Sequence, residues 1–220
     1  MITIQTRKDI GFLEDRKDWS KEKAVFDEHT LRIAGHPVME DWELGYMQRL
    51  AEVASQNGGR VLELGYGLGL SAQAIQDQGI KDHYVIECHP DVIARCAKDK
   101  HDAIGKNTLH ILSGYWEDIT PLLADETFDG ILFDTYPLSE EEVHANHFWF
   151  FKEAYRLLKT GGTFTYYSDE ASNFSDKHMA KLLEAGFEKE KINFELCTVN
   201  PPEDCEYWKD KTLLVPIITK

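Results

Sequence analysis

Long apolar runs and cysteines are both scarce in this chain of 220 residues. No stretch approaches the roughly 18 consecutive apolar residues of a membrane-spanning helix. The first ten residues lack the apolar core of a signal peptide. The cysteines are Cys88, Cys96, Cys197 and Cys205, and no two of them form a C-x-x-C pair. We therefore predict a cytoplasmic protein with reduced thiols and no membrane partner, and we expect neither a disulfide framework nor a zinc site.

Positive charge is also scarce, because 24 Lys and Arg face 39 Asp and Glu and the formal net charge is −15. Surfaces that bind nucleic acids or anionic membranes depend on basic patches, so both partner classes are disfavoured, whereas a cationic substrate is compatible. The histidines are scattered, and Glu141-x-x-His144 is only half of a di-iron pattern. We assign His144 and His147 to the surface or to packing and expect no metal site.

Hydrophobic residues make up 42% of the chain and recur at strand-like and helix-like spacings. We predict one domain over residues 1–220, with an N-terminal helical cover (residues 1–57) and a sheet core (residues 58–220). Residues 1–19 are polar and expected to be flexible, with Trp19 tucked against the body. Helices are expected over residues 20–33, 38–53, 69–78, 90–99, 139–158 and 177–185. Strands are expected over residues 60–65, 83–88, 109–112, 128–134, 163–167, 191–199 and 208–219.

The alternation of strands and helices predicts an α/β, Rossmann-like fold whose parallel sheet is covered on both faces. The last two strands are joined by the loop 200–205, which is too short for a crossover helix, so they should pair antiparallel. A seven-stranded, mostly parallel sheet with one antiparallel edge hairpin is typical of class I methyltransferases. A plain dinucleotide-binding fold has no reason to end in this way.

A glycine-rich turn follows the first core strand, at Gly65, Gly67 and Gly69. Glycines let the backbone turn sharply and leave room for a ligand at the carboxyl end of a strand. The dinucleotide pattern G-x-G-x-x-G counted from Gly65 fails at Leu70, and a shifted match from Gly67 begins two residues late. With Glu63 in the strand, the segment resembles the first motif of class I S-adenosylmethionine (SAM) methyltransferases; a turn without a ligand is the alternative.

Acidic residues end two further strands of the predicted sheet. Glu87 follows the glycine turn by about 20 residues, where a carboxylate can accept both ribose hydroxyls of an adenosine in NAD and SAM enzymes alike. Tyr115 and Trp116 could lie near an adenine or be ordinary core aromatics. Asp134 should face the same crevice, and a carboxylate there is costly without a cation, which indicates a positively charged acceptor. Glu43 lies on an acidic helix that by itself reads as a solvated face.

Several separated segments resemble the guanidinoacetate N-methyltransferase family, over roughly residues 19 to 219. The most specific are Pro37-Val-Met-Glu40 and Asp134-Thr-Tyr-Pro-Leu-Ser139. The resemblance implies SAM as methyl donor, S-adenosylhomocysteine (SAH) as product and a small guanidino acceptor. It also implies that Glu43 and Asp134 grip the guanidinium group, with Tyr136 beside them and Asp134 as candidate base. Contacts to SAM are implied for Trp19, Met39, Met47, Glu63, Gly65, Tyr66, Gly67, Leu68, Gly69, Leu70, Glu87, Cys88, Tyr115, Trp116 and Asp134.

One segment departs from the family pattern. Where the family binds the carboxylate of its acceptor with backbone amides, this chain has Ser168-Asp-Glu-Ala-Ser172. Asp169 and Glu170 should repel a carboxylate and attract an amine, so we predict that both contact the substrate. Two acceptors stay open: a guanidine with a cationic tail, such as agmatine, and guanidinoacetate itself, if both acids point to solvent.

Other classes of protein compete with this interpretation. An NAD-dependent oxidoreductase is disfavoured by the glycine spacing and the terminal hairpin. A SAM-binding regulatory or interaction protein is disfavoured because Glu43 and Asp134 are both retained. A protein methyltransferase is disfavoured by the N-terminal segment with Trp19, which suggests a closed pocket for a small acceptor. The sequence is compatible with a monomer or a homodimer.

Overall fold

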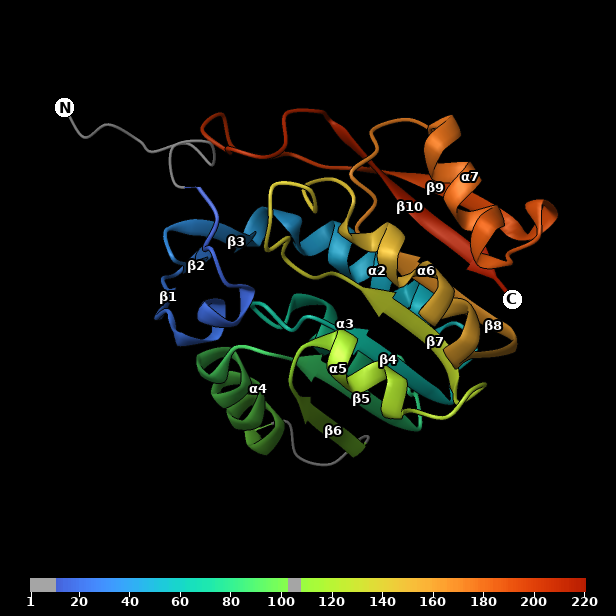
Figure 1. Cartoon of the computed structure of the whole chain (residues 1–220), viewed down its shortest axis with the longest axis horizontal. Coiled ribbons are helices and arrows are strands. Elements are labelled where there is room, and N and C mark those ends of the chain that lie inside the picture. Colours follow the sequence, from blue (N-terminus) through green and yellow to red (C-terminus); the bar gives the residue numbers. More distant parts are fainter. Residues whose placement is uncertain (1–10, 103–107) are drawn as a thin grey trace.

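The computed structural model describes residues 11–102 and 108–220, so the predicted flexibility of residues 1–10 lies outside the described part (Figure 1). Residues 16–21 form a short 3-10 helix, η1 (Arg16–Lys21), which begins where the Asp15 carboxylate accepts a hydrogen bond from the Lys17 backbone N–H. Trp19 on this helix is only 5% exposed, which confirms that it is tucked against the body.

A seven-stranded sheet forms the centre of the molecule, in the strand order β6-β5-β4-β7-β8-β10-β9. The first five of these strands run parallel, and β10 is antiparallel to both of its neighbours. The predicted α/β fold with one antiparallel edge hairpin is thereby confirmed. The strands are β4 (Arg60–Leu64), β5 (Asp82–Glu87), β6 (Thr108–Ser113), β7 (Phe128–Phe133), β8 (Leu158–Tyr166), β9 (Ile192–Thr198) and β10 (Thr212–Thr219).

The order in which strands are added to the sheet reverses between β4 and β7. These two strands are parallel neighbours although about 60 residues separate them in sequence. From β4 the chain proceeds to β5 and β6 on one side, and then returns to β7 and β8 on the other. In open α/β sheets, such a switch point leaves a crevice outside the carboxyl ends of the two central strands. Here those ends carry Gly65 and Asp134, and the Asp134 N–H donates to the Leu64 carbonyl over 2.9 Å.

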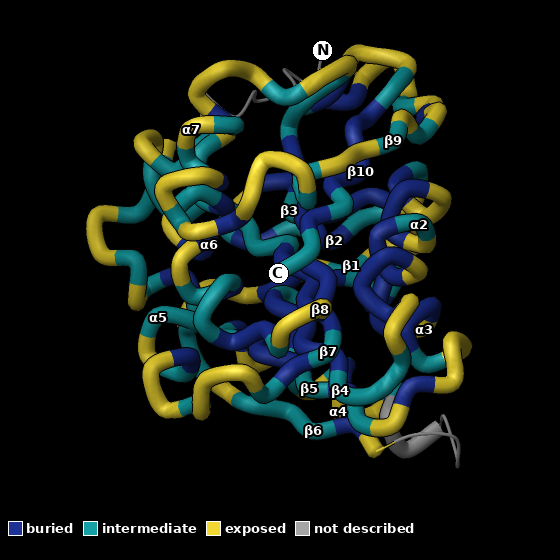
Figure 2. The backbone as a smooth tube through the Cα atoms, turned by 90° about the vertical axis from the view of Figure 1, so that its right-hand side faces the viewer, coloured by how far each residue is buried: buried dark blue, intermediate teal, exposed yellow. Residues whose placement is uncertain are grey.

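Helices cover both faces of the sheet. Val61 and Leu132 face α2 (Leu44–Ser55) and α3 (Leu70–Asp77), and Val85 faces α4 (Pro90–Asp102) on the same side. Leu62 and Phe133 face the opposite layer of α5 (Trp116–Ile119), α6 (Asn146–Leu157) and α7 (Asp176–Ala185). The buried residues follow the central strands and the inner side of α2 (Figure 2). Within the described residues, no helix combines the length and apolar character needed to cross a membrane.

The N-terminal cover is not the helical one predicted. Residues 20–33 hold β1 (Ala24–Phe26) and β2 (Thr30–Ile33). With β3 (His36–Glu40) they form a separate three-stranded antiparallel sheet in which β2 is the central strand. The helix expected over 38–53 begins only at Leu44, after β3 and the 3-10 turn η2 (Asp41–Glu43). The physical reason is visible in β2, where buried Leu31 and Ile33 flank the outward Arg32 in the alternation of a strand.

The helix expected over 139–158 is wrong in its first half, because residues 139–145 form turns and α6 begins at Asn146. Ser139 is therefore not its capping residue. Instead, a Glu142 carboxylate oxygen accepts a hydrogen bond from the Leu138 N–H at 2.6 Å and holds the loop after β7. The remaining 3-10 turns are η3 (Thr120–Leu122) and η4 (Lys189–Lys191).

Candidate functional site

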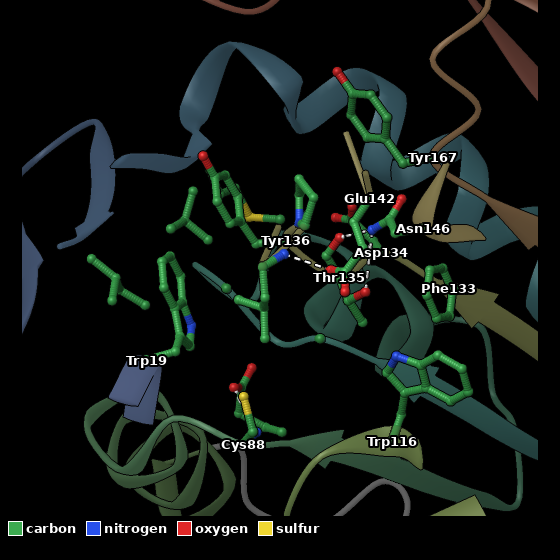
Figure 3. Close-up of a pocket in the computed structure, with 18 of the residues that line it drawn as sticks. Trp19, Cys88, Trp116, Phe133, Asp134, Thr135, Tyr136, Glu142, Asn146 and Tyr167 are labelled. Carbon is green, nitrogen blue, oxygen red and sulfur yellow. Dashed lines mark hydrogen bonds between the residues drawn. The ribbon is translucent and has the colours of Figure 1, made fainter. Parts of the chain in front are cut away.

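A cavity lies at the carboxyl ends of β4, β5 and β7, where the β1–β3 sheet and η1 cover the crevice (Figure 3). We call one side the glycine-turn end (Gly65, Gly67, Glu87, Cys88, Tyr115, Trp116). We call the other the carboxylate end (Glu43, Asp134, Tyr167, Asp169, Tyr207). Figure 3 shows Cys88 and Trp116 on one side of the cavity and Tyr167 on the other, with Asp134 between them. The predicted site residues that line it are Trp19, Met39, Glu43, Gly65, Gly67, Glu87, Cys88, Tyr115, Trp116, Asp134, Tyr136 and Asp169.

The glycine turn is compact because other atoms approach its backbone closely. Gly65 has φ +85°, and a Cβ there would lie 2.0 Å from the Asp134 carbonyl oxygen. Gly67 has φ +54°, and a Cβ there would lie 2.8 Å from the Met39 sulfur. That sulfur also accepts a hydrogen bond from the Leu68 N–H at 3.3 Å. Only glycine can adopt this backbone conformation with other protein atoms so close. The glycines therefore allow the tight turn that borders the cavity.

Glu87 is the anchor of the glycine-turn end. One of its oxygens accepts from the N–H groups of Cys88 and His89, both at 2.8 Å, and the other accepts from the Tyr66 N–H at 3.0 Å. A carboxylate offers about four acceptor sites, so Glu87 has one left, on Oε2, for a ligand hydroxyl. Its position at the cavity agrees with the predicted ribose site, but it has capacity for one hydroxyl where the prediction required two.

The N-terminal segment closes over this end through aromatic and ionic contacts. Trp19 stacks on Tyr136 of the loop after β7, with ring centroids 5.2 Å apart and planes at 7°. Arg16 donates to Glu117 at 2.6 Å, and the Tyr115 hydroxyl donates to the Arg16 carbonyl at 2.8 Å. Residues far apart in sequence are thereby held together as one wall of the cavity.

At the carboxylate end, Glu43 is 3% exposed and is positioned by η2. Its Oε1 accepts from the Glu40 N–H at 3.0 Å and from the Tyr207 hydroxyl. Among the described residues both hydrogen bonds end on Oε1, so Oε2 can accept from a ligand. Burial, followed by repulsion from Asp134, raises the pKa of Glu43 to about 8.

Asp134 faces the same part of the cavity from the end of β7. Within the described part of the chain its side chain accepts no hydrogen bond and has no ion-pair partner. Burial, with repulsion from Glu63 and Asp169, raises the pKa of Asp134 to about 7. Neither the Glu43 nor the Asp134 carboxylate has a cationic partner among the described residues, so a cation from outside the protein would stabilise their charged forms.

Some predicted site residues do not reach the cavity. Glu63 is fully buried in β4, where it accepts from the Ser71 hydroxyl and lies 3.0 Å from His83 Nε2. The Tyr66 side chain turns away and donates to Asp99 at 2.7 Å. The Glu170 carboxylate accepts from the Ser175 N–H at 3.2 Å at the start of α7. The predicted contacts that lie outside the lining are therefore those of Met47, Glu63, Tyr66, Leu68, Gly69, Leu70 and Glu170.

Two tyrosines of the carboxylate end were missed from the sequence. Tyr207 belongs to the loop between β9 and β10 and lies 164 positions away from Glu43, which its hydroxyl contacts. The Tyr167 hydroxyl is buried and has no hydrogen-bond partner among the described residues. The signal for Tyr167 was available, since it directly follows a strand that ends at the crevice. No local pattern marks Tyr207, because only the hairpin's place in the sheet brings it to Glu43.

Comparison with known sequences gives one family and a set of relatives. The profile of the guanidinoacetate N-methyltransferase family matches residues 12–220. A protein arginine N-methyltransferase 2 from Yarrowia lipolytica is 29% identical over 173 residues, covering 74% of this chain and 35% of the relative. Another, from Aspergillus fumigatus, is 33% identical over 165 residues, covering 70% and 37%. This chain thus spans little more than a third of the length of these relatives.

Solved structures with a similar fold include spermidine synthase from Thermotoga maritima, with a TM-score of 0.61 and 16% identity, covering 90% of this chain and 72% of that one. A spermidine synthase in complex with the transition-state analogue AdoDATO has a TM-score of 0.63 at 16% identity and the same coverage. At this identity the likeness shows the fold alone.

Proposed function

Because the chain belongs to the guanidinoacetate N-methyltransferase family, we propose that it transfers the methyl group of SAM to a nitrogen of a guanidino compound. The observation that carries this proposal is a pair of carboxylates, the buried Glu43 and the half-buried Asp134, which face one end of the cavity and have no cationic partner among the described residues. A guanidinium group is the cation that fits two carboxylates best, because its planar N–H groups are taken in pairs.

The glycine-turn end suits SAM. Gly65 and Gly67 border the cavity with backbone atoms, Glu87 has an acceptor site for a ribose hydroxyl, and Trp19, Tyr115 and Trp116 supply aromatic surface. SAM, when bound, supplies an electrophilic methyl group on a positively charged sulfur. The acidic lining of the cavity favours that charge.

The residues of this chain would then do three things. Glu43 Oε2 and the Asp134 carboxylate accept N–H bonds of the guanidinium and fix which nitrogen faces the methyl group. The Tyr207 hydroxyl and the Glu40 N–H hold the Glu43 carboxylate in place. Such alignment of reacting groups is a main source of rate enhancement in a displacement.

Proton removal is assigned to Asp134. A guanidinium nitrogen has no free lone pair, so an N–H proton must leave before or during the transfer. The raised pKa of Asp134, about 7, makes this carboxylate a better base than an ordinary aspartate. Glu43 stabilises the positive charge that remains on the guanidine.

We propose a small guanidine as the acceptor, since the stack of Trp19 on Tyr136 and the β1–β3 sheet cover part of the cavity. A second candidate is an arginine side chain of a protein, which the names of the curated relatives favour. The location in the cytoplasm stays a prediction.

The test is to incubate the protein with SAM and a set of guanidines, and to follow SAH formation together with the mass of the acceptor. The set contains butylguanidine, agmatine, guanidinoacetate and an arginine-containing peptide. We expect SAH and a singly methylated small guanidine in equal amounts, and neither product with Asp134→Asn. Methylation of the peptide alone would select the second candidate, and no methylated guanidine of any kind would refute the proposal.

A further inference from the structure

Acidic side chains outnumber basic ones in the lining of the cavity. Six carboxylates line it, those of Glu43, Glu87, Glu117, Asp134, Glu142 and Asp169, but Arg16 is the only Lys or Arg among its described lining residues. Arg16 is already paired with Glu117 at 2.6 Å, next to Tyr115. The carboxylate end therefore offers no lysine or arginine with which to bind an anionic group of the acceptor.

Asp169 is held at this end in a strained backbone conformation. Its φ is +55°, in the left-handed region that residues with a side chain rarely adopt. Its partner His144, on the loop between β7 and α6, has φ +57°. The two side chains meet with His144 Nδ1 3.1 Å from Asp169 Oδ1. Backbone strain of this kind, from two separate loops, is typical of functional sites.

The surroundings of Asp169 place it on the acceptor side of the cavity. It lies near enough to Asp134 for its charge to help raise the pKa of that carboxyl. Tyr167 lines the cavity near both carboxylates, whose charges help to raise the pKa of its hydroxyl, and this buried hydroxyl lacks a protein partner among the described residues. This unpaired hydroxyl is an independent sign that a polar ligand group belongs here. The contact with His144 uses Oδ1, which leaves Asp169 Oδ2 for that ligand.

Resting on the proposed function, we propose that the acceptor is a small guanidine whose tail carries a second positive charge and no carboxylate, and that Asp169 Oδ2 contacts that charge. Glu43 and Asp134 bind the guanidinium, and Asp169 selects the tail. The adjacent acid, Glu170, takes no part, because its carboxylate accepts from Ser175 N–H and lies 3.4 Å from His178 Nδ1. Of the two acids that depart from the family pattern, only one faces the ligand.

The test compares acceptors of similar length and different tail charge: agmatine (ammonium), butylguanidine (no charge) and 4-guanidinobutyrate (carboxylate). Their kcat/KM values are measured at saturating SAM and pH 8 with the natural protein, Asp169→Asn and Glu170→Gln. Asparagine tolerates a positive φ better than other residues with a side chain, so Asp169→Asn removes the charge and keeps the backbone. Glu170→Gln removes the neighbouring charge outside the cavity and is the matched control.

We expect the natural protein to prefer agmatine over 4-guanidinobutyrate by about tenfold or more, with butylguanidine between them. Asp169→Asn should reduce that preference about tenfold and change butylguanidine less than about threefold, whereas Glu170→Gln should keep the preference. Equal use of agmatine and 4-guanidinobutyrate by the natural protein would overturn the inference, and so would an unchanged preference in Asp169→Asn. If no guanidine is methylated, the proposed function itself is wrong. If the variant does not fold, the preference of the natural protein between agmatine and 4-guanidinobutyrate tests the inference by itself.

Discussion

The two ends of the cavity differ in how far the protein satisfies its own polar groups. At the glycine-turn end, Glu87 accepts three backbone N–H bonds and Arg16 is paired with Glu117. At the carboxylate end, the Asp134 side chain and the Tyr167 hydroxyl lack protein partners among the described residues. Burial and repulsion between neighbouring carboxylates raise the pKa values of Asp134 and Glu43 to about 7 and about 8.

This difference indicates that the glycine-turn end is a rigid binding site and that the carboxylate end is the reactive site. A satisfied carboxylate holds its shape whether or not a ligand is present, which suits the binding of a cofactor. A carboxylate without a protein partner lowers the stability of the folded protein, and binding of a ligand offsets that loss. Substitutions at the two ends should therefore affect different quantities, and each of the following experiments can confirm or break that division.

The largest effect should come from Asp134→Asn. This change removes both a guanidinium contact and the proposed base, so kcat should fall at least about 1,000-fold. Relative to the natural protein, the variant should gain stability as the pH rises from about 4 to about 7 and keep that gain above pH 7, because the raised pKa of Asp134 lets the unfolded chain ionise this carboxyl before the folded protein does. Thermal unfolding at pH 5 and pH 8 checks the second effect. Loss of SAH affinity by more than about tenfold would show that the two ends are not separate.

Glu87→Ala should act mainly on the cofactor. It leaves the N–H groups of Tyr66, Cys88 and His89 without their acceptor, so the native state should lose about 1–3 kcal/mol. Affinity for SAH, measured by calorimetry, should fall about 100-fold through the lost ribose contact and the loosened turn. Glu87→Gln is the control, since its amide oxygen still accepts. Unchanged SAH affinity in Glu87→Ala would contradict the assignment of this end.

Guanidine binding should depend on pH, and SAH binding should not. The folded pKa values of both carboxyls are raised. As the pH falls, Glu43 therefore takes up a proton near pH 8 and Asp134 near pH 7. A protonated carboxyl cannot pair with a guanidinium, so affinity for butylguanidine in the SAH complex should fall about tenfold between pH 8 and pH 7, and more steeply below pH 7 where both carboxyls are protonated. A flat profile between pH 6 and pH 8 would remove these two acids from the binding site.

Tyr207→Phe should have the smallest of these effects. Loss of its hydrogen bond frees Glu43 Oε1 without removing the charge, so KM for the guanidine should rise about tenfold while SAH affinity stays the same. The conservative change keeps the ring contact with Trp42, whose centroid lies 5.8 Å away. A larger loss in kcat than in KM would indicate that Tyr207 acts in the chemical step.

Most of the fold was predictable because it depends on regular patterns. The core strands, the glycine turn and the antiparallel hairpin follow from hydrophobic periodicity and chain order, and the family match confirms the resemblance carried by the Asp134 and Pro37 segments. The cover was predicted wrongly because strands of three and four residues, such as β1 and β2, are too short to display a period distinct from that of a helix.

The site was predictable only where it coincides with strand ends. Glu87 and Asp134 end buried strands, so their place at the crevice follows from the sheet. The contact of Tyr207 with Glu43, the hydrogen bonds that occupy Glu87, and the opposite orientations of Asp169 and Glu170 depend on tertiary packing that no local pattern encodes. The roles of all these residues in binding and catalysis stay predictions.

Proton release on guanidine binding tests the central claim most directly. Butylguanidine is titrated into the SAH complex at pH 7 by calorimetry, in buffers of different ionisation enthalpy. We predict release of a substantial fraction of a proton or more, because the guanidinium displaces protons from Glu43 and Asp134, with little release at pH 9 and a smaller release in Asp134→Asn. Binding without proton release at pH 7, or with the same release in Asp134→Asn, would contradict the claim that these carboxylates hold the acceptor.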